Sequence, residues 1–121
     1  MVVTPTGIPD AFLVEPKRLP DDRGFFARTW CDEDAVAQGS NPTVAQCNVS
    51  FNPKAGTLRG MHFQEAPHAE AKLVRCTAGA VFDVFIDLRP SSPMFKRWDG
   101  GELTVDNHCM LYCRKAARTV T

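Results

Sequence analysis

Short strand-like segments separated by turn residues recur along this chain, and they restrict it to folds built mainly from β-sheet. The clearest segment runs from Val81 to Leu88 and follows a turn at Gly79. Successive side chains of a strand point to opposite faces of the sheet. This segment is therefore expected to form one fully apolar face from its even-numbered residues, which are Phe82, Val84, Ile86 and Leu88.

Similar segments bounded by glycine, proline or aspartate predict further strands over Phe12–Glu15, Phe25–Trp30, Val44–Phe51, Thr57–Gln64, Lys72–Thr77, Leu103–Val105 and Met110–Tyr112. One short helix is expected over Asp32–Gln38, with Asp32 as its N-cap and Gly39 at its end. Many short strands at this spacing predict a single all-β domain over residues 1–121, either a sandwich or a barrel and most simply a jelly roll.

Charge and composition exclude several classes of partner. Lysine and arginine together number 14, as do aspartate and glutamate, so the chain is not expected to bind nucleic acid or an acidic membrane. No apolar run has the length of a membrane span or of a signal-peptide core. Five scattered cysteines without such a signal indicate reduced thiols and a cytoplasmic protein.

His62 is the first candidate for catalysis, because it stands within a strand-like segment close to Gly60. Histidine exchanges protons readily near neutral pH, so it can act as a base, although a hydrogen-bonded sheet histidine is the more common case. Arg59 lies three residues earlier, which in a regular strand puts it on the opposite face. A bulge at Gly60 is one way to bring both side chains into one cavity.

Four further polar residues are candidates for catalysis or ligand binding, although none is specific alone. Lys72 can stabilise a developing oxyanion, and Arg23, in a turn, offers a guanidinium that matches phosphate. Gln46 and Asn48 share one face of a predicted strand and can contact hydroxyl or phosphate oxygens. Each residue can also be explained without a function. Lys72 can be a solvated strand end, Arg23 an ordinary turn residue, and Gln46 and Asn48 part of a polar outer face.

Metal and nucleotide-loop chemistry are disfavoured. A metal-binding jelly roll often carries two histidines two residues apart, whereas His62 is followed by Phe63 and Gln64. Other sets of ligands are weak, since they combine loop residues or lack a second cluster; they are His62 with His68 and Glu70, and His108 with Cys109 and Cys113. No glycine-rich phosphate loop or dinucleotide fingerprint occurs.

The order of several motifs nevertheless resembles one family. The segments are Thr6–Asp10, Glu15–Pro16, Asp22–Phe26, Gln46–Asn48, Leu58–Gln64, Lys72–Arg75, Val81–Val84, Asp87–Arg89 and Ser92–Pro93. Together they resemble the dTDP-4-dehydrorhamnose 3,5-epimerases almost continuously up to Tyr112. The pair Leu-Arg-Gly-x-His-x-Gln and Lys-Leu-Val-Arg is its most specific part.

The resemblance implies a cupin-type jelly roll that works as a homodimer exchanging N-terminal strands. It also implies a cofactor-independent enzyme acting on a nucleotide-linked 4-keto-6-deoxy sugar, whose C3 and C5 protons the keto group acidifies. His62 would then be the base, and Lys72 would hold the enolate oxygen. Residues implied in substrate binding are Arg23 and Arg59 at the diphosphate, with Phe26, Gln46 and Asn48 lining the sugar-nucleotide cleft.

Arg28 departs from the family pattern, because many members carry glutamate there. The nucleotide contacts and the preferred sugar are therefore left open by the sequence. A 3,5-epimerase, a 3-only or 5-only epimerase and a ketoisomerase all remain compatible with it.

The last nine residues, Cys113–Thr121, also depart from the family, which continues with a pattern like Val-Pro-Glu-Gly-x-Ala-His-Gly. Codons can be chosen for this tail such that restoring one G before it gives Val-Pro-Glu-Gly-Cys-Ala-His-Gly-Tyr. We therefore expect an aberrant tail after a single-base deletion, on a jelly roll that is incomplete at its C-terminus. The family's acid tyrosine and base-orienting aspartate lie beyond this point, so the 121-residue chain is expected to be inactive, or to bind sugar nucleotide or pair with an intact subunit.

Overall fold

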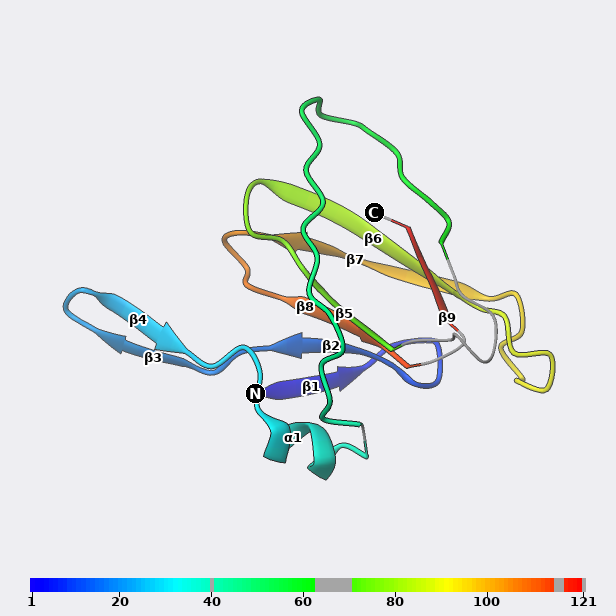
Figure 1. Cartoon of the computed structure of the whole chain (residues 1–121), viewed down its shortest axis with the longest axis horizontal. Helices are drawn as coiled ribbons and strands as arrows, with labels where there is room; N and C mark the ends of the chain where they lie inside the picture. The colour runs from blue at the N-terminus through cyan, green and yellow to red at the C-terminus, as the bar shows by residue number, and fades with distance from the viewer. Residues whose placement is uncertain (40, 63–70, 115–116, 121) are drawn as a thin grey trace.

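The computed structural model describes residues 1–39, 41–62, 71–114 and 117–120, the last four by their backbone. Within these residues the chain forms one short helix and nine strands, so the all-β prediction is confirmed (Figure 1). The elements are β1 (Val2–Pro5), β2 (Ala11–Glu15), β3 (Arg18–Asp21), β4 (Gly24–Ala27), α1 (Asp32–Ala37), β5 (Lys72–Arg75), β6 (Ala80–Asp87), β7 (Trp98–Thr104), β8 (Met110–Cys113) and β9 (Ala117–Val120). In the described part of the chain, no helix is long and apolar enough to cross a membrane.

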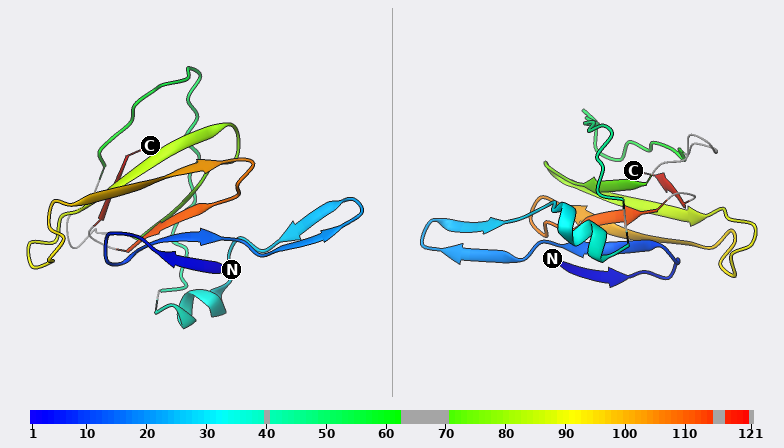
Figure 2. Two further views of the ribbon diagram at one scale, coloured as in Figure 1. Left: turned by 180° about the vertical axis from the view of Figure 1, so that it is seen from behind. Right: turned by 60° about the horizontal axis from the view of Figure 1, so that its bottom comes forward.

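The strands form two facing sheets and a separate hairpin (Figure 2). A four-stranded sheet has the order β1-β2-β8-β5, and a three-stranded sheet has the order β7-β6-β9; every pairing is antiparallel. The β3–β4 hairpin projects from the body of the molecule, and α1 lies beside the four-stranded sheet near the N-terminus. Strands distant in sequence thus meet, since β8 is hydrogen-bonded between β2 and β5.

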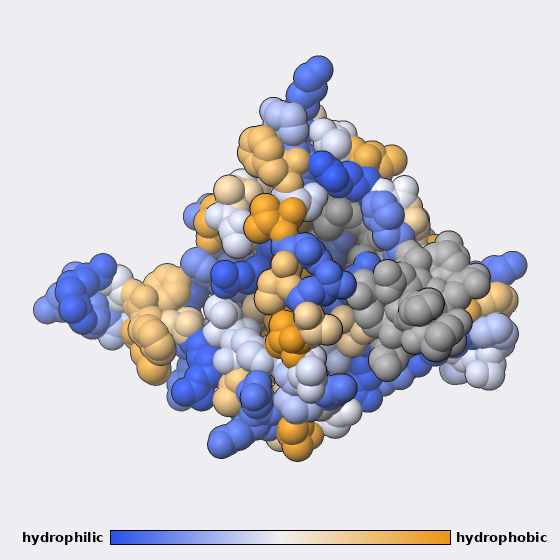
Figure 3. Space-filling model, viewed as in Figure 1, coloured by the Kyte–Doolittle hydropathy of each residue, from blue (hydrophilic) through white to orange (hydrophobic). Residues whose placement is uncertain are grey.

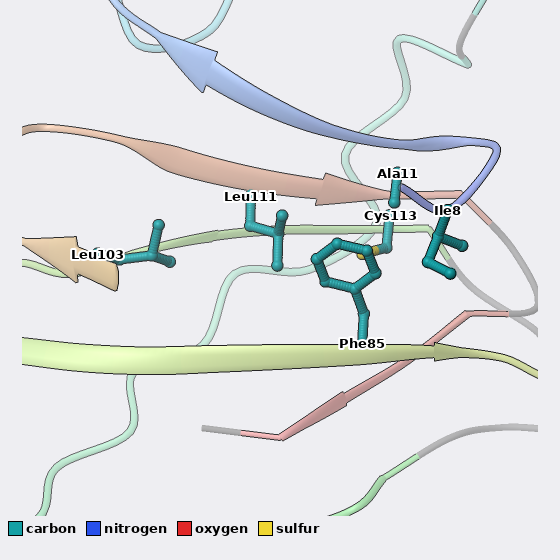
Figure 4. Close-up of a cluster of buried hydrophobic side chains, with 6 residues drawn as sticks. All are labelled: Ile8, Ala11, Phe85, Leu103, Leu111 and Cys113. Atoms are coloured by element: carbon teal, nitrogen blue, oxygen red, sulfur yellow. The ribbon is translucent and has the colours of Figure 1, made fainter. Parts of the chain in front are cut away.

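The hydrophobic core fills the space between the two sheets (Figure 4). It consists of buried residues from both sheets and from the loop after β1, namely Ile8, Ala11, Phe85, Leu103, Leu111 and Cys113. The sheets approach closely, because a Cβ atom added to Gly101 of β7 would lie 3.1 Å from Leu13 Cδ1 of β2. Burial of these apolar side chains supplies the main driving force for holding the sheets together.

The apolar face predicted for β6 is not the buried face of this strand, because the opposite face points into the molecule. Asp83, Phe85 and Asp87 point into the molecule with no exposed surface, whereas Phe82 is 57% exposed. Phe85 packs with the core, and Gly100 on β7 lies too close to the carbonyl oxygen of Asp83 for any larger residue. The alternation of side chains along β6 therefore defines its two faces. Packing against the opposite sheet determines which of them is buried.

The predicted strands Val44–Phe51 and Thr57–Gln64 are also wrong over the described residues. Residues 41–61 form an extended segment without a strand, and His62 makes a single isolated bridge. Its apolar side chains stay in solvent, as Val49 at 87% and Leu58 at 82% exposure show. Strand propensity does not form a sheet unless a neighbouring strand takes up the backbone hydrogen bonds. Residues 63–70 lie outside the described part of the chain.

Smaller differences concern the hairpin and the helix. The strand expected over Phe25–Trp30 ends at Ala27, and its partner β3 precedes the predicted turn. Helix α1 forms where it was predicted, but its N-cap is Cys31, without a side-chain cap. Asp32 instead accepts a hydrogen bond from Trp30 Nε1 at 3.0 Å, so its carboxylate is used outside the helix.

A buried ion pair joins the end of β6 to the N-terminal loop. The Asp87 carboxylate accepts from Arg89 Nε at 3.0 Å, from Arg89 Nη2 at 2.9 Å and from Ser92 Oγ at 2.5 Å. Arg89 Nη1 also donates to Asp10 Oδ2 at 2.6 Å. These donors hold the pKa of Asp87 down at about 2, with the Arg89 side chain as the main cause.

Replacing this carboxylate is expected to destabilise the fold. The Asp87→Asn change leaves Arg89 without its buried counter-charge, and it should lower the free energy of unfolding by about 2–4 kcal/mol at pH 7. The pKa of Asp87 is below that of an unfolded aspartate, so its contribution is complete above about pH 4 and declines as the pH falls towards 2. Urea unfolding of both proteins from pH 2 to 7 measures this.

The matched control is Asp21→Asn, which breaks the exposed Arg23–Asp21 pair on the hairpin. Exposed pairs contribute little because water and salt screen them, so no measurable change in stability is expected. An equal loss of stability in both variants would contradict a structural role for the Asp87–Arg89 pair.

Candidate functional site

Lys72 enters the space between the two sheets, a placement that follows from strand register. On β5, Lys72 stands directly opposite Cys113 of β8, and Val74 stands opposite Leu111. Directly opposed residues of an antiparallel pair share a face of the sheet. Because Cys113 and Leu111 belong to the core, the Lys72 side chain is on the inner face.

Asp83 approaches the same space from the opposite sheet. Its side chain has no exposed surface, and neither carboxylate oxygen has a hydrogen-bond partner among the described residues. Burial raises the pKa of Asp83 to about 7, although the positive charge of Lys72 acts to lower it. Asp83 and Lys72 are thus electrostatically coupled inside the sandwich.

Cys113 completes what we call the interior cluster, which consists of Lys72, Asp83 and Cys113. Burial raises the pKa of the Cys113 thiol to about 12, with a further increase from Asp83 and a decrease from Lys72. The thiol is therefore neutral and inert at physiological pH. The cluster offers one ammonium and one carboxyl group in a largely apolar interior, where charges interact strongly.

This arrangement can stabilise negative charge that develops on a substrate oxygen. A half-buried ammonium group on the inner face of the sheet is placed to do so. Asp83 was missed as a site residue from the sequence, because the apolar even-numbered face of its strand was the stronger signal. The signal that could have identified it is an aspartate in the middle of the strongly apolar segment Val81–Leu88.

Two predicted binding residues lie on the β3–β4 hairpin, away from the interior cluster. Arg23 forms an ion pair with Asp21 at 2.8 Å at the hairpin turn, and its side chain is 90% exposed. Phe26 is 70% exposed, and Figure 3 shows apolar surface on the hairpin next to its hydrophilic tip. Both side chains are thus open to a ligand or to another protein surface.

The remaining predicted residues lie on the extended segment 41–62. Arg59 donates hydrogen bonds to Asn52 Oδ1 and, at 3.0 Å, to the carbonyl oxygen of Phe51. Asn48 Nδ2 donates to Gln46 Oε1 at 3.5 Å, so this pair lies side by side as expected, although in no strand. His62 is exposed.

The predicted residues therefore lie on three separate parts of the fold. These are the hairpin, the extended segment and the inner face of the four-stranded sheet. The structure brings Gln46 to Asn48, and it brings Lys72 to the unforeseen Asp83. The bulge expected at Gly60 does not apply, because no strand forms there. The catalytic and binding roles of these residues stay predictions.

A metal centre does not emerge from the described residues. Among them, no group of three or more histidine, cysteine, aspartate or glutamate side chains could hold an ion. His108 instead packs its ring edge-on against Phe25, with centroids 4.9 Å apart. Two of the alternative ligands, His68 and Glu70, lie outside the described part of the chain.

Comparison with known proteins supports one family. The family model for dTDP-4-dehydrorhamnose 3,5-epimerase matches residues 5–117. The chain is 44% identical over 115 residues to the dTDP-4-dehydrorhamnose 3,5-epimerase of Shigella flexneri, covering 93% of this chain and 62% of that protein. It therefore spans about three-fifths of the length of this curated relative.

Solved structures give the same result. The Bacillus anthracis dTDP-4-dehydrorhamnose 3,5-epimerase, crystallised with TDP and PPi, superposes with a TM-score of 0.92 at 41% identity, covering 98% of this chain and 68% of that one. The Legionella pneumophila enzyme, in complex with dTDP-4-keto-L-rhamnose, gives 0.80 at 30% identity, covering 98% and 63%. These matches confirm the predicted cupin-type fold.

The carboxyl group of Asp83 gives a test of the interior cluster. Asp83 keeps its proton up to about pH 7 in the folded chain, whereas an unfolded aspartate loses it near pH 4. Between these values the folded state binds more protons, so the free energy of unfolding should fall as the pH rises. Asp83→Asn should remove this slope and stabilise the protein at pH 8 by about 2 kcal/mol or more.

Urea unfolding across pH 4–8 and the titration of the Asp83 carboxyl carbon resonance measure these effects. Lys72→Met is the companion variant, because loss of the positive charge should move the pKa of Asp83 further upward. A carboxyl resonance that titrates near pH 4 in all proteins would exclude the proposed coupling.

Proposed function

Since the chain belongs to the dTDP-4-dehydrorhamnose 3,5-epimerase family, we propose that it carries part of a cofactor-independent epimerase site for a nucleotide-linked 4-keto-6-deoxy sugar. The reaction is epimerisation at C3, at C5 or at both carbons of dTDP-4-dehydro-6-deoxyglucose. One observation carries the proposal, namely the placement of Lys72 beside Asp83 in the interior between the sheets. The names of the longer relatives support the same activity.

The chemistry requires a base, an oxyanion partner and an acid. The 4-keto group acidifies the protons on C3 and C5, and His62 removes one of them. The electrons of the broken C–H bond form an enolate, whose oxygen accepts a hydrogen bond from the Lys72 ammonium group. An acid then returns a proton to the opposite face of the same carbon, which inverts its configuration and regenerates the ketone.

The surroundings of Lys72 suit the role of oxyanion partner. Asp83, with a pKa of about 7, is partly protonated at neutral pH, and the positive charge of Lys72 acts on it across the interior. The low-dielectric interior then increases the attraction between the ammonium group and the developing enolate.

Substrate binding is assigned to residues outside the interior. Arg23 and Arg59 would hold the diphosphate through guanidinium hydrogen bonds, and Phe26, Gln46 and Asn48 would line the sugar-nucleotide cleft. Because Arg23 and Phe26 lie on a hairpin that projects from the body, they are suited to reach the site of a second subunit in a homodimer (Figure 1). The TDP bound to the Bacillus anthracis relative supports a nucleotide-sugar ligand.

A second candidate function is sugar-nucleotide binding without catalysis. It is favoured by the distribution of the predicted residues over three parts of the fold, since most of their side chains are exposed to solvent. A protein of this kind could still bind dTDP or pair with an intact subunit. Proton exchange distinguishes the two functions, because it needs the base but not the acid.

The decisive assay follows hydrogen exchange from dTDP-4-dehydro-6-deoxyglucose in heavy water by proton NMR. We expect deuterium at C3 or C5 without net epimerisation, because enolate formation needs the base, whereas inversion also needs an acid on the opposite face. The carbon that exchanges identifies which epimerase or isomerase the protein is. His62→Asn and Lys72→Met should each reduce exchange to background.

Lys54→Met is the matched control, because it removes an exposed lysine of the extended segment. Exchange should be unchanged in this variant. Tight binding of dTDP with no exchange above the buffer rate would select the non-catalytic function. Epimerisation at the full rate of the longer relative would refute the expectation that residues 113–121 impair activity.

We further propose that the tail Cys113–Thr121 arises from loss of one base immediately before the codon for Cys113. Reading the nucleotide sequence there should show codons that give a family-like frame on restoring one G, as TGC CGG AAG GCT GCG CGC ACG GTT would. An AAA codon for Lys115 or an AGA codon for Arg114 would rule this out. A restored frame that continues with an acid tyrosine would support the enzyme.

A further inference from the structure

Two cysteines follow the last paired residues of β5 and β8. The ladder between these strands ends with Arg75 opposite Met110. One further step of the same register sets Cys76, the residue after β5, opposite Cys109, the residue before β8. Both thiols are free and half-buried in the structure. We call these two residues the thiol pair.

Both members of the thiol pair lie on the inner face of the four-stranded sheet. Val74 and Leu111 stand opposite each other on that face, and each cysteine is two residues further along its own chain segment. Packing agrees with this register, because Cys76 and Cys109 both pack against the buried core cluster. The two side chains therefore point into the same space from neighbouring segments.

The two connections that carry the thiol pair are held together at their other ends as well. The connection from β5 to β6 begins with Cys76, and the connection from β7 to β8 ends with Cys109. The Val105 N–H donates to the Gly79 carbonyl oxygen at 3.0 Å, so the two connections meet again where they join the second sheet. Asn107 Oδ1 accepts from the Cys109 N–H at 2.9 Å, which fixes the backbone at this cysteine.

The expected separation of the thiol pair suits a disulfide. Opposed residues of antiparallel strands have Cα atoms about 4.5 or 5.5 Å apart, depending on whether the pair is hydrogen-bonded. A disulfide spans Cα separations of about 4.4–6.8 Å, so both spacings are suitable. Cys113 is a poor alternative partner, because it stands opposite Lys72, which is four residues before Cys76 and thus about 13 Å away along the strand.

We propose that Cys76 and Cys109 are a site of oxidative modification, at which they form a reversible disulfide. The oxidant is a low-molecular-weight disulfide such as oxidised glutathione. One cysteine attacks it as the thiolate, which gives a mixed disulfide and releases one small thiol. The second cysteine then attacks the protein sulfur of the mixed disulfide, which forms the Cys76–Cys109 bond and releases the second small thiol. Two electrons and two protons thus pass from the protein thiols to the small disulfide.

Core packing explains each cysteine singly, because a free cysteine behaves as a small apolar residue. Cys113 is an example, since its thiol is buried and it stands opposite a lysine. Cys76 and Cys109 differ from it, because each is half-buried and the register sets each opposite a second thiol. An opposed and partly accessible pair is what thiol–disulfide exchange requires.

The bond would hold β5 and β8 together at the point where both leave the four-stranded sheet. It closes a loop of chain that contains β6 and β7, and such a cross-link lowers the conformational entropy of the unfolded state. Lys72 lies at the other end of β5, so the bond forms away from the proposed catalytic lysine. The disulfide thus links the stability of the fold to the thiol redox state.

Incubation of the full 121-residue chain with oxidised glutathione, followed by alkylation and peptide mapping, tests the disulfide. We expect the loss of two of the five free thiols and one linked peptide that contains Cys76 and Cys109. Digestion with trypsin and chymotrypsin identifies the bond, because cleavage after Tyr112 separates Cys109 from Cys113. The oxidised protein should melt about 5 °C or more above the reduced protein. Dithiothreitol should reverse both changes.

Cys76→Ala and Cys109→Ala should each abolish the linked peptide and the rise in melting temperature on oxidation. Cys47→Ala is the matched control, because it removes an exposed cysteine of the extended segment, and it should be oxidised like the parent protein. Peptide mapping of the parent protein decides the matter even where a variant folds poorly. Thiols that stay free, mixed disulfides with glutathione alone, or a bond from Cys76 or Cys109 to any other cysteine would overturn the proposal.

Discussion

The hydrogen-bonded register of β8 between β2 and β5 is the constraint on which the rest of the structure depends. It places Leu111 between Leu13 and Val74, and it sets Cys113 opposite Lys72. A slip of one residue would send every side chain of β8 to the other face, and the core would lose Leu111 and Cys113. The same slip would remove Cys113 from its place opposite Lys72. The register that builds the core therefore also assembles the interior cluster.

The local sequence was sufficient to predict the position of an element wherever that element depends only on its own residues and one neighbouring element. The strands around Phe12 and Leu73 and the helix at Asp32–Ala37 form close to where their patterns predicted them. The inner face of β6 was not predictable in this way. Apolar content favoured the face of Phe82, but Phe85 fits the opposite sheet and Arg89 neutralises Asp87 there. These partners lie far apart in the sequence or in the following loop, so alternation alone could not select the face.

The candidate site shows the same limit. Single residues such as His62, Lys72 and Arg59 could be named as candidates, because they belong to a sequence motif that is specific to one family. Their spatial relation could not be derived, since the segment containing Val49 and Leu58 has strand propensity but no described neighbour to pair with. Asp83 was missed for another reason. Its importance lies in burial and in the nearby charge of Lys72, and these arise only when the two sheets face each other.

The two buried aspartates of β6 then differ in what they do for the fold. Asp87 is surrounded by donors and has a lowered pKa, so its charge stabilises the native state. Asp83 has no hydrogen-bond partner among the described residues and a raised pKa, so its charge opposes folding at neutral pH. Groups that oppose stability persist at sites where their chemistry is used. The unfavourable carboxyl lies beside the lysine assigned to the enolate, which is where such a group has a chemical use.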